Sequence, residues 1–232
     1  MLNVIVDWQH IDTVLLDMDG TLLDRRFDDH FWLEHVPQRY AEKHGLPLAP
    51  TKEHLYAQFR SQERTLNWTD LDYWSEQLGL DIPLLKLEVE HLIAVHPFVV
   101  EFLLFLSQQG KRSYLVTNAH GKTLELKLKR TRLGPYFTGI ISAHDLGLPK
   151  EENAFWQRLQ QQIPYDPART LLGEDSETNL ESAATFGIRH LIFVSRANSA
   201  LTPQPSRRFP SINYFSELIP REGSIVTLTK HS

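Results

Sequence analysis

The chain has 232 residues, of which 41% are hydrophobic and 23% are charged, so it can form one large globular domain or a core with a smaller insert. Its net charge of −5 comes from 24 basic and 29 acidic residues, which leaves no basic excess for binding a nucleic acid polymer or an anionic membrane. The absence of cysteine excludes disulfides, thiol nucleophiles and cysteine-bound metals.

Five short apolar runs predict buried strands, and helical patterns separate the later ones. None of the runs alternates polar with apolar residues, which is typical of parallel strands covered on both faces. The predicted strands are 13–19, 112–118, 139–145, 170–175 and 190–195, and the predicted helices between and after them are 97–110, 121–134, 152–162 and 176–187. This order predicts an α/β fold with a Rossmann-like, doubly wound parallel sheet.

Residues 25–95 interrupt this alternation, because they contain helical patterns and no convincing strand. The expected helices are 28–45, 51–66, 70–79 and 83–94, with a possible kink at Pro37. The sequence therefore predicts an all-helical cap domain at 25–95, inserted into a core made of 1–24 and 96–232. The segment 196–211, which is rich in proline and serine, is expected to be a loop.

Nothing in the sequence indicates a secreted or membrane-bound protein. The N-terminal segment lacks the basic start and long apolar stretch of a signal peptide. The apolar segment 97–106 is too short to span a membrane. We therefore expect a cytoplasmic protein, either a monomer or a homodimer.

Polar side chains gather where the predicted strands end, and in open α/β sheets this edge is where ligands bind. These residues are Asp17, Asp19, Thr117, Asn118, Lys150, Glu174 and Asp175. Crowded carboxylates stay ionised only beside a cation, and a ligand set made of oxygen atoms alone suits Mg²⁺. The sequence thus predicts a magnesium site at this edge of the sheet.

The spacing of the first two aspartates suggests separate chemical roles. Residues i and i+2 of a strand face the same way, so Asp17 and Asp19 can address one reacting group. Asp17 can act as a nucleophile that forms an acyl phosphate, and Asp19 can give a proton to the leaving oxygen and later take one from water. Gly20 allows a sharp turn and a close approach to a ligand. The expected chemistry is the transfer of a phosphoryl group.

Four motifs occur in the order typical of the haloacid dehalogenase superfamily. "DMDGT" at 17–21 resembles its first motif, "LVTNA" at 115–119 its second, "GLPK" at 147–150 its third and "LLGEDSETNLESA" at 171–183 its fourth. The resemblance spans the chain and implies a Rossmann-like core, Mg²⁺ and an aspartyl-phosphate intermediate. The predicted insert at 25–95 is similar to the helical cap of one subgroup of this superfamily.

The resemblance also implies a role for each motif residue. Asp17 would be the nucleophile and a metal ligand, and Asp19 the acid/base, with its main-chain carbonyl on the metal. Thr117, Asn118 and Lys150 would bind phosphate, with Lys150 also neutralising Asp17, and Asp175 would bind the metal. Glu174 stands where aspartate is commoner, so it could bind the metal directly or through water. Glu151 replaces the proline that usually follows the lysine of the third motif.

A finer resemblance concerns the substrate. The segments 65–81 and 136–156 are similar to bacterial enzymes described as GMP/IMP 5′-nucleotidases. Trp68 could stack on a purine and Asn67 could donate a hydrogen bond to its 6-oxo group. The aromatic residues Trp68, Tyr73 and Trp74 are better explained as the core of the cap, since aromatics at helical spacing usually pack inward.

Other functions stay open at this level. The same residues suit a phosphatase or phosphomutase for another small metabolite, such as phosphoglycolate or a sugar phosphate. They also suit a binding module of the same fold that has lost its activity. Arg25 and Arg26, just after the first motif, could meet an anionic substrate or be solvated charges.

Overall fold

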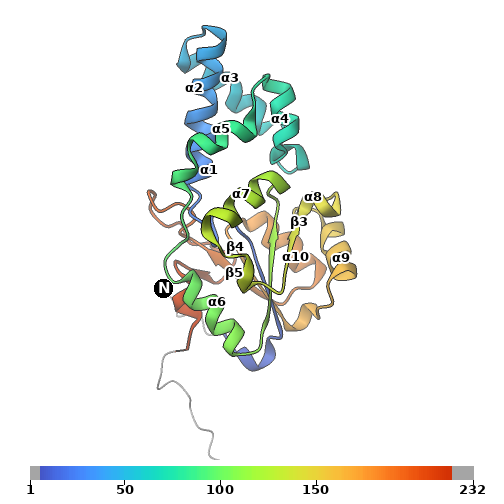
Figure 1. Cartoon of the computed structure of the whole chain (residues 1–232). Coiled ribbons are helices and arrows are strands. Elements are labelled where there is room, and N and C mark those ends of the chain that lie inside the picture. Colours follow the sequence, from blue (N-terminus) through green and yellow to red (C-terminus); the bar gives the residue numbers. More distant parts are fainter. Residues whose placement is uncertain (1–5, 221–232) are drawn as a thin grey trace, which may run out of the picture.

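The centre of the molecule is a parallel sheet of six strands in the order β3-β2-β1-β4-β5-β6. The computed structural model describes residues 6–220 (Figure 1). The strands are β1 (Thr13–Leu16), β2 (Arg112–Thr117), β3 (Gly139–Ser142), β4 (Thr170–Glu174), β5 (His190–Val194) and β6 (Ser211–Ile212). This order is doubly wound, which confirms the predicted fold class.

Helices cover both faces of the sheet. They are α6 (Val99–Gln108), α7 (Gly121–Thr131), α8 (Ala143–Leu146), α9 (Asn153–Gln162) and α10 (Glu177–Phe186), with short 3₁₀ turns at Trp8–His10, Gly134–Tyr136, Pro167–Arg169 and Phe215–Leu218. Neighbouring residues of β1 belong to different cores: Leu16 shares one with Phe102 of α6, and Leu15 shares another with Trp156 of α9. Because every residue of β1 is buried, its sequence shows no alternation.

Between β1 and β2 the chain forms a group of helices that stands beyond the carboxyl ends of the strands (Figure 1). These helices are α1 (Arg26–His30), a π-helical turn (Phe31–His35), α2 (Val36–His44), α3 (Leu48–Arg60), α4 (Leu71–Leu78) and α5 (Ile82–Glu88), with 3₁₀ turns at Leu66–Trp68 and Glu90–Leu92. Residues 25–95 are all described and contain no strand. The predicted helical content is therefore confirmed, whereas the division into two domains stays a prediction.

The chain enters and leaves this helical group through two segments that pair with each other. The backbone N–H of Asp24 donates to the carbonyl of Ala94 at 2.9 Å, and that of His96 donates to the carbonyl of Leu22 at 2.9 Å. Leu23 and Val95 thereby form an antiparallel bridge. The two crossings lie side by side, next to the loop that carries Asp19.

Some boundaries differ from the sequence prediction for local reasons. The predicted strand at 139–145 ends at Ser142, because the Ser142 hydroxyl accepts from the N–H of His144 while Asp145 accepts from the N–H of Ser142, a capping box that starts α8. Strand β6 forms where a loop was expected. Pro37 does not end the helical run, because α1, the π-helical turn at Phe31–His35 and α2 follow one another without a gap and the residues before Pro37 keep helical dihedrals.

None of the helices within residues 6–220 is long and apolar enough to cross a lipid bilayer.

Candidate active site

The side chains predicted to act all follow the carboxyl ends of strands, as expected for this topology. Asp17 comes directly after β1, Thr117 ends β2 and Asn118 follows it, Lys150 lies beyond β3 and α8, Glu174 ends β4, and Asp175 comes next. They line one cavity of about 480 Å³ together with Asp19. The fold thus brings together residues that are up to 158 positions apart in the sequence, from 17 to 175.

Lys150 is the cation at the floor of this cavity. Its side chain is 1% exposed, and its Nζ donates to Asp17 Oδ1 at 2.5 Å, to Glu174 Oε2 at 2.7 Å and to the carbonyl of Val116 at 3.2 Å. Burial alone would lower the pKa of Lys150, but the two carboxylates outweigh it and the pKa is raised. Lys150 therefore keeps its charge at neutral pH.

Glu174 is held by donors of the protein on both of its oxygens. Oε2 accepts from Lys150, and Oε1 accepts from the backbone N–H groups of Asp175 and Ser176, each at 3.1 Å. A carboxylate fixed in this way orients the lysine that it contacts. Glutamate therefore has a physical role at this position, where aspartate is commoner in the motif. Its side chain reaches Lys150, and its hydrogen bonds to the two backbone N–H groups anchor the end of β4.

Burial shapes the charge of the other carboxyls. The pKa of Asp17 is raised to about 6, first by burial and then by the charge of Glu174, against the opposing effect of Lys150. The pKa of Asp175 is raised well above its usual value, again mainly by burial and next by Glu174. These carboxyl groups lie together in one buried space, and the positive charge beside them is too small to keep all of them ionised.

Asp175 meets two parts of the chain that follow β1. Its Oδ2 accepts from Arg25 Nη1 at 2.9 Å, so one of the two arginines after the first motif reaches the cavity. Gly20 has a φ of +85°, and a Cβ there would lie 2.2 Å from Asp175 Oδ2. Only glycine fits both that backbone conformation and that contact.

Asp19 belongs to a chain of buried ion pairs that sequence reasoning missed. Lys127 of α7 is 1% exposed, and its Nζ lies 2.6 Å from Asp19 Oδ1 and 2.6 Å from Asp28 Oδ2 of α1. Lys86 of α5, also buried, contacts Asp28 Oδ1 at 3.4 Å. Alternating charges thus connect the predicted acid/base to the helical group above the sheet.

The charges in this row of ion pairs do not fully compensate one another. The pKa of Asp19 is raised to about 6, chiefly by burial, although Lys127 opposes the shift. Burial would lower the pKa of Lys127, but Asp19 and Asp28 outweigh it and raise it. The pKa of Lys86, which has one distant carboxylate, is lowered by burial to about 8. A carboxyl that titrates near neutral pH can both give and take a proton.

The residues at the end of β2 are locally engaged. Thr117 Oγ1 accepts from the N–H of Ala119 at 3.0 Å. The Asn118 side chain accepts from the N–H of Lys150 and donates to Glu151 Oε2, each at 3.0 Å. Asn118 therefore fixes the loop of Lys150, and Glu151 completes this contact.

The upper wall of the cavity comes from the helical group and is largely aromatic. Trp32, Leu33, Tyr56, Phe59, Trp68 and Trp74 line it. Trp68 is 39% exposed, whereas Trp74 is 1% exposed and packs edge-on against Phe59 at 5.0 Å. The predicted aromatic cluster is thus divided: Trp74 packs in the interior of the helical group, Tyr73 does not line the cavity, and Trp68 faces it.

Asn67 does not line the cavity, and its Nδ2 donates to Gln62 Oε1 at 3.0 Å instead. The polar residues of this region that line the cavity are Arg60, Glu63 and Thr69, of which Arg60 and Glu63 are charged. Within residues 6–220, the side chains of Arg60 and Glu63 form no hydrogen bond or ion pair. Sequence reasoning missed both because Arg60 ends α3 and Glu63 follows in an exposed turn, where they resemble ordinary solvated charges.

The match to known families decides the classification. Residues 11–187 match the haloacid dehalogenase-like hydrolases. The chain belongs to this family. The GMP/IMP nucleotidase YrfG of Escherichia coli (strain K12) is 39% identical to this hydrolase over 219 residues, which cover 94% of this chain and 99% of that protein. The nucleotidase of the same name from Shigella flexneri matches to the same extent.

Solved structures of the family share the fold of this hydrolase. A HAD phosphatase from Thermococcus onnurineus has a TM-score of 0.77 at 21% identity, covering 89% of this chain and 95% of that one. The HAD-hydrolase YfnB from Bacillus subtilis, solved bound to magnesium, has a TM-score of 0.59 at 21% identity, covering 89% and 96%. These likenesses confirm the architecture.

The residues of this hydrolase fit the Mg²⁺ that its family generally uses. Carboxylate oxygens of Asp17, Glu174 and Asp175 lie within 4.8 Å of one another. Asn179 Oδ1 lines the same cavity, is buried and has no hydrogen-bond partner among the residues described. Hard oxygen donors in this arrangement suit Mg²⁺. Glu174 already accepts hydrogen bonds on both of its oxygens, from Lys150 and from two N–H groups.

Proposed function

We propose that this hydrolase is a Mg²⁺-dependent phosphatase for purine nucleoside 5′-monophosphates, with GMP and IMP preferred. The observation that carries the proposal is one cavity with two different walls. Asp17, Asp19 and Lys150 form its floor, and aromatic side chains with one arginine and one glutamate form its roof. Its volume of about 480 Å³ lies in the range of small-molecule sites, roughly 300–1,000 Å³. The 39% identical nucleotidase supports the same substrate class.

The first step transfers the phosphoryl group to Asp17. A carboxylate oxygen of Asp17 attacks phosphorus, and the bond between phosphorus and the 5′-oxygen breaks. Asp19, protonated, gives its proton to that leaving oxygen, so that a nucleoside alcohol departs. Lys150 holds Asp17 in place and its charge faces the phosphoryl oxygens.

The second step regenerates the enzyme. Asp19, now ionised, takes a proton from a water molecule, which attacks phosphorus and breaks its bond to Asp17. Inorganic phosphate leaves, and Asp19 again carries a proton. Lys127, 2.6 Å from Asp19, keeps this carboxyl in place through both steps. When bound beside Asp17 and Asp175, Mg²⁺ would supply positive charge next to the phosphoryl oxygens.

The roof explains a preference for 6-oxopurines. Trp68 offers a stacking surface, and Arg60 and Glu63 line the same cavity without a partner inside residues 6–220. GMP and IMP share acceptors at O6 and N7, which suit a guanidinium, and an N1–H donor, which suits a carboxylate. AMP keeps N7 but has an amine in place of O6 and no proton at N1, so the contact of the guanidinium with O6 and the contact of the carboxylate with N1–H are lost.

A phosphate-release panel tests this proposal. The purified chain is assayed with GMP, IMP, AMP, CMP, UMP, phosphoglycolate, a hexose phosphate and p-nitrophenyl phosphate, with Mg²⁺ and with EDTA. We expect kcat/KM to be highest for GMP and IMP and activity to require Mg²⁺. A higher kcat/KM for phosphoglycolate or the hexose phosphate would overturn the nucleotide assignment and keep the phosphatase. No release from any compound would favour a binding module.

A further inference from the structure

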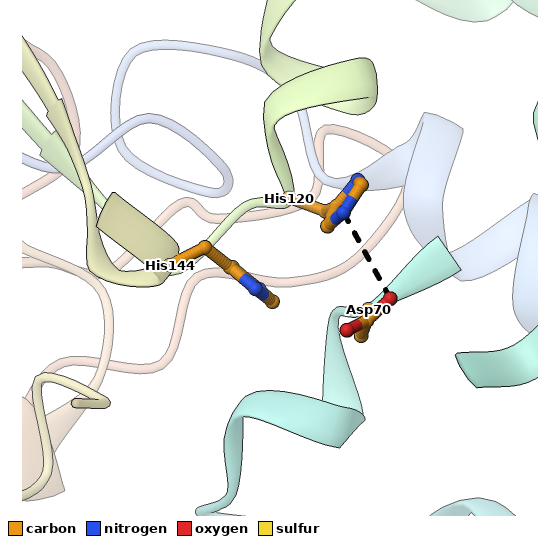
Figure 2. A group of neighbouring side chains, drawn as sticks. All are labelled: Asp70, His120 and His144. Atoms are coloured by element: carbon orange, nitrogen blue, oxygen red, sulfur yellow. Dashed lines mark ion pairs between the residues drawn. The ribbon is translucent and has the colours of Figure 1, made fainter. Parts of the chain in front are cut away.

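A second cluster of metal-binding side chains lies outside the predicted catalytic set. Asp70, His120 and His144 each offer one ligand atom, and these atoms all lie within 4.8 Å of one another. Figure 2 shows the three side chains turned toward a common space. Asp70 precedes α4 of the helical group, His120 precedes α7 and His144 lies in α8, so the cluster joins three separate elements.

The carboxylate of this cluster is rigidly placed. Asp70 Oδ1 accepts from the N–H groups of Asp72 and Tyr73 at 2.8 and 3.1 Å, which caps the start of α4. The same oxygen lies 3.8 Å from His120 Nε2. Within residues 6–220, the other oxygen of Asp70 makes no hydrogen bond. One carboxylate oxygen is therefore fixed by the helix, and the second is available to a cation.

The two imidazoles lie next to each other in the cluster, and His120 Nδ1 also accepts from the backbone N–H of Lys122 at 3.4 Å, which leaves its Nε2 facing Asp70. Their rings lie 5.0 Å apart and nearly perpendicular, at 87°. The Thr69 hydroxyl donates to the carbonyl of Asn118 at 2.6 Å, so its contact of 2.9 Å with His144 Nε2 uses a proton on that nitrogen. With that proton on Nε2, Nδ1 of a neutral His144 keeps its lone pair.

We propose that Asp70, His120 and His144 form a site for a divalent transition metal of the Zn²⁺ class. Imidazole nitrogen with one carboxylate is a donor set that prefers Zn²⁺ and its neighbours, whereas Mg²⁺ prefers oxygen alone. Three protein ligands leave a fourth tetrahedral position for water or for Asp72, whose Oδ2 lies 3.9 Å from His120 Nε2. Metal binding would draw these ligand atoms, which lie within 4.8 Å of one another, together by side-chain rotation.

Such a metal would connect the helical group to the sheet. Asp70 belongs to the helices, whereas His120 stands three residues after Thr117 at the end of β2 and His144 follows β3. The site shares no residue with Asp17, Glu174 and Asp175. Bound metal is therefore expected to raise the melting temperature, and to do so without occupying the predicted Mg²⁺ site.

Cobalt(II) is a direct probe, because four-coordinate Co²⁺ with nitrogen ligands absorbs visible light far more strongly than six-coordinate Co²⁺ on oxygen. The full chain is titrated with CoCl₂ in saturating Mg²⁺, and the bound metal is then displaced with ZnCl₂. The variants are H120Q, H144Q and D70N. Asparagine is also a good helix cap, so D70N keeps the start of α4 while weakening the ligand. H54Q, at an exposed position of α3, is the matched control.

The proposal predicts intense visible bands that saturate at one Co²⁺ per chain in wild type, in H54Q and in D175N. Losing an outer partner of a metal ligand costs about 10- to 100-fold in affinity, so H120Q, H144Q and D70N should lose at least this much. Zn²⁺ should raise the melting temperature of wild type and not of H144Q. Bands that persist in H120Q and H144Q but vanish in D175N would overturn the proposal, as would the absence of bands in wild type.

Discussion

At the scale of single residues, Asp17 is the side chain whose change should separate chemistry from folding. Lys150 retains Glu174 as a partner when the charge of Asp17 is removed. We predict that D17N lowers kcat by at least about a thousandfold, as for other covalent nucleophiles, because an amide cannot attack phosphorus. Phosphate release gives the rate, and far-UV circular dichroism shows whether the fold is kept. A rate within tenfold of wild type would remove Asp17 from this role.

Arg60 provides the test of base recognition. A hydrogen bond to a charged group contributes roughly 1.5–3 kcal/mol, so we predict that R60Q raises KM for GMP and IMP about 10- to 100-fold. KM for AMP, which keeps N7 but lacks O6, should rise less. R64Q is the matched control, since Arg64 is an exposed neighbour that does not line the cavity. Equal effects of R60Q on GMP and AMP would show that Arg60 does not recognise O6.

Single residues also show where sequence reasoning reached its limit. Asp17 and Asp175 could be predicted because each follows a run of buried apolar residues, and parallel strands end at one edge. Lys127 carried a weaker signal: it lies on the buried face of α7, three and four positions after the buried Leu124 and Thr123. Its partner Asp28 is 99 positions away in sequence, so only the fold reveals the contact.

At the scale of elements, α7, α1 and α5 are joined by the two buried lysines, Lys127 and Lys86. Replacing one or the other should have opposite effects on the stability of the fold. Replacing Lys127 leaves Asp19 and Asp28 without their shared cation, so we predict that K127M lowers the free energy of unfolding by about 3 kcal/mol or more. In K86M, Asp28 keeps Lys127, and we predict an unchanged or higher stability, by up to about 3 kcal/mol. Urea unfolding at pH 7 compares the two variants, and equal losses would contradict the assignment.

The lowered pKa of Lys86 also predicts how the difference in stability between K86M and the wild type depends on pH. Its pKa is about 8 in the folded state and has an ordinary value of 10.5. Between pH 8 and pH 10.5 the unfolded chain binds more protons than the folded chain. The destabilising effect of the buried, charged Lys86 is therefore complete below pH 8 and decreases as the pH rises. We predict that the stability gap between K86M and wild type narrows from pH 8 to 10.5. Urea unfolding at several pH values measures this gap.

Elements differ in how far the sequence determines them. The five longer strands were predictable because helices cover both faces of the sheet, and β1, β2 and β4 are almost wholly buried, which favours apolar runs without alternation. The end of β3 was not, since a capping box of Ser142 and Asp145 overrides a sequence that suits a strand. Strand β6 has two residues and depends on its neighbour β5. Short strands and strand ends set by a local cap depend on contacts that the hydrophobic periodicity of the sequence does not show.

At the scale of the whole molecule, the cavity has a floor on the sheet and a roof on the helices, so substrates of different size should depend on them differently. Stacking of a base on an aromatic ring contributes about 1–3 kcal/mol, so we predict that W68A raises KM for GMP about 5- to 100-fold. KM for p-nitrophenyl phosphate, which has no purine, should change little. Y73A is the control, because Tyr73 is a neighbouring aromatic residue that does not line the cavity and should affect the melting temperature instead. A loss of thermal stability alone in W68A would make Trp68 a packing residue.

The two paired segments at 22–24 and 94–96, through which the chain enters and leaves the helical group, have a consequence for the evolution of substrate specificity. Because the helical group starts and ends at one point, its length and sequence can change without altering the order or register of the strands. Asp17 and Lys150 stay at the edge of the sheet, while the aromatic wall of the cavity belongs to the helical group that can change. Ancestral lineages could therefore exchange substrates by remodelling one insertion while the reaction was inherited unchanged.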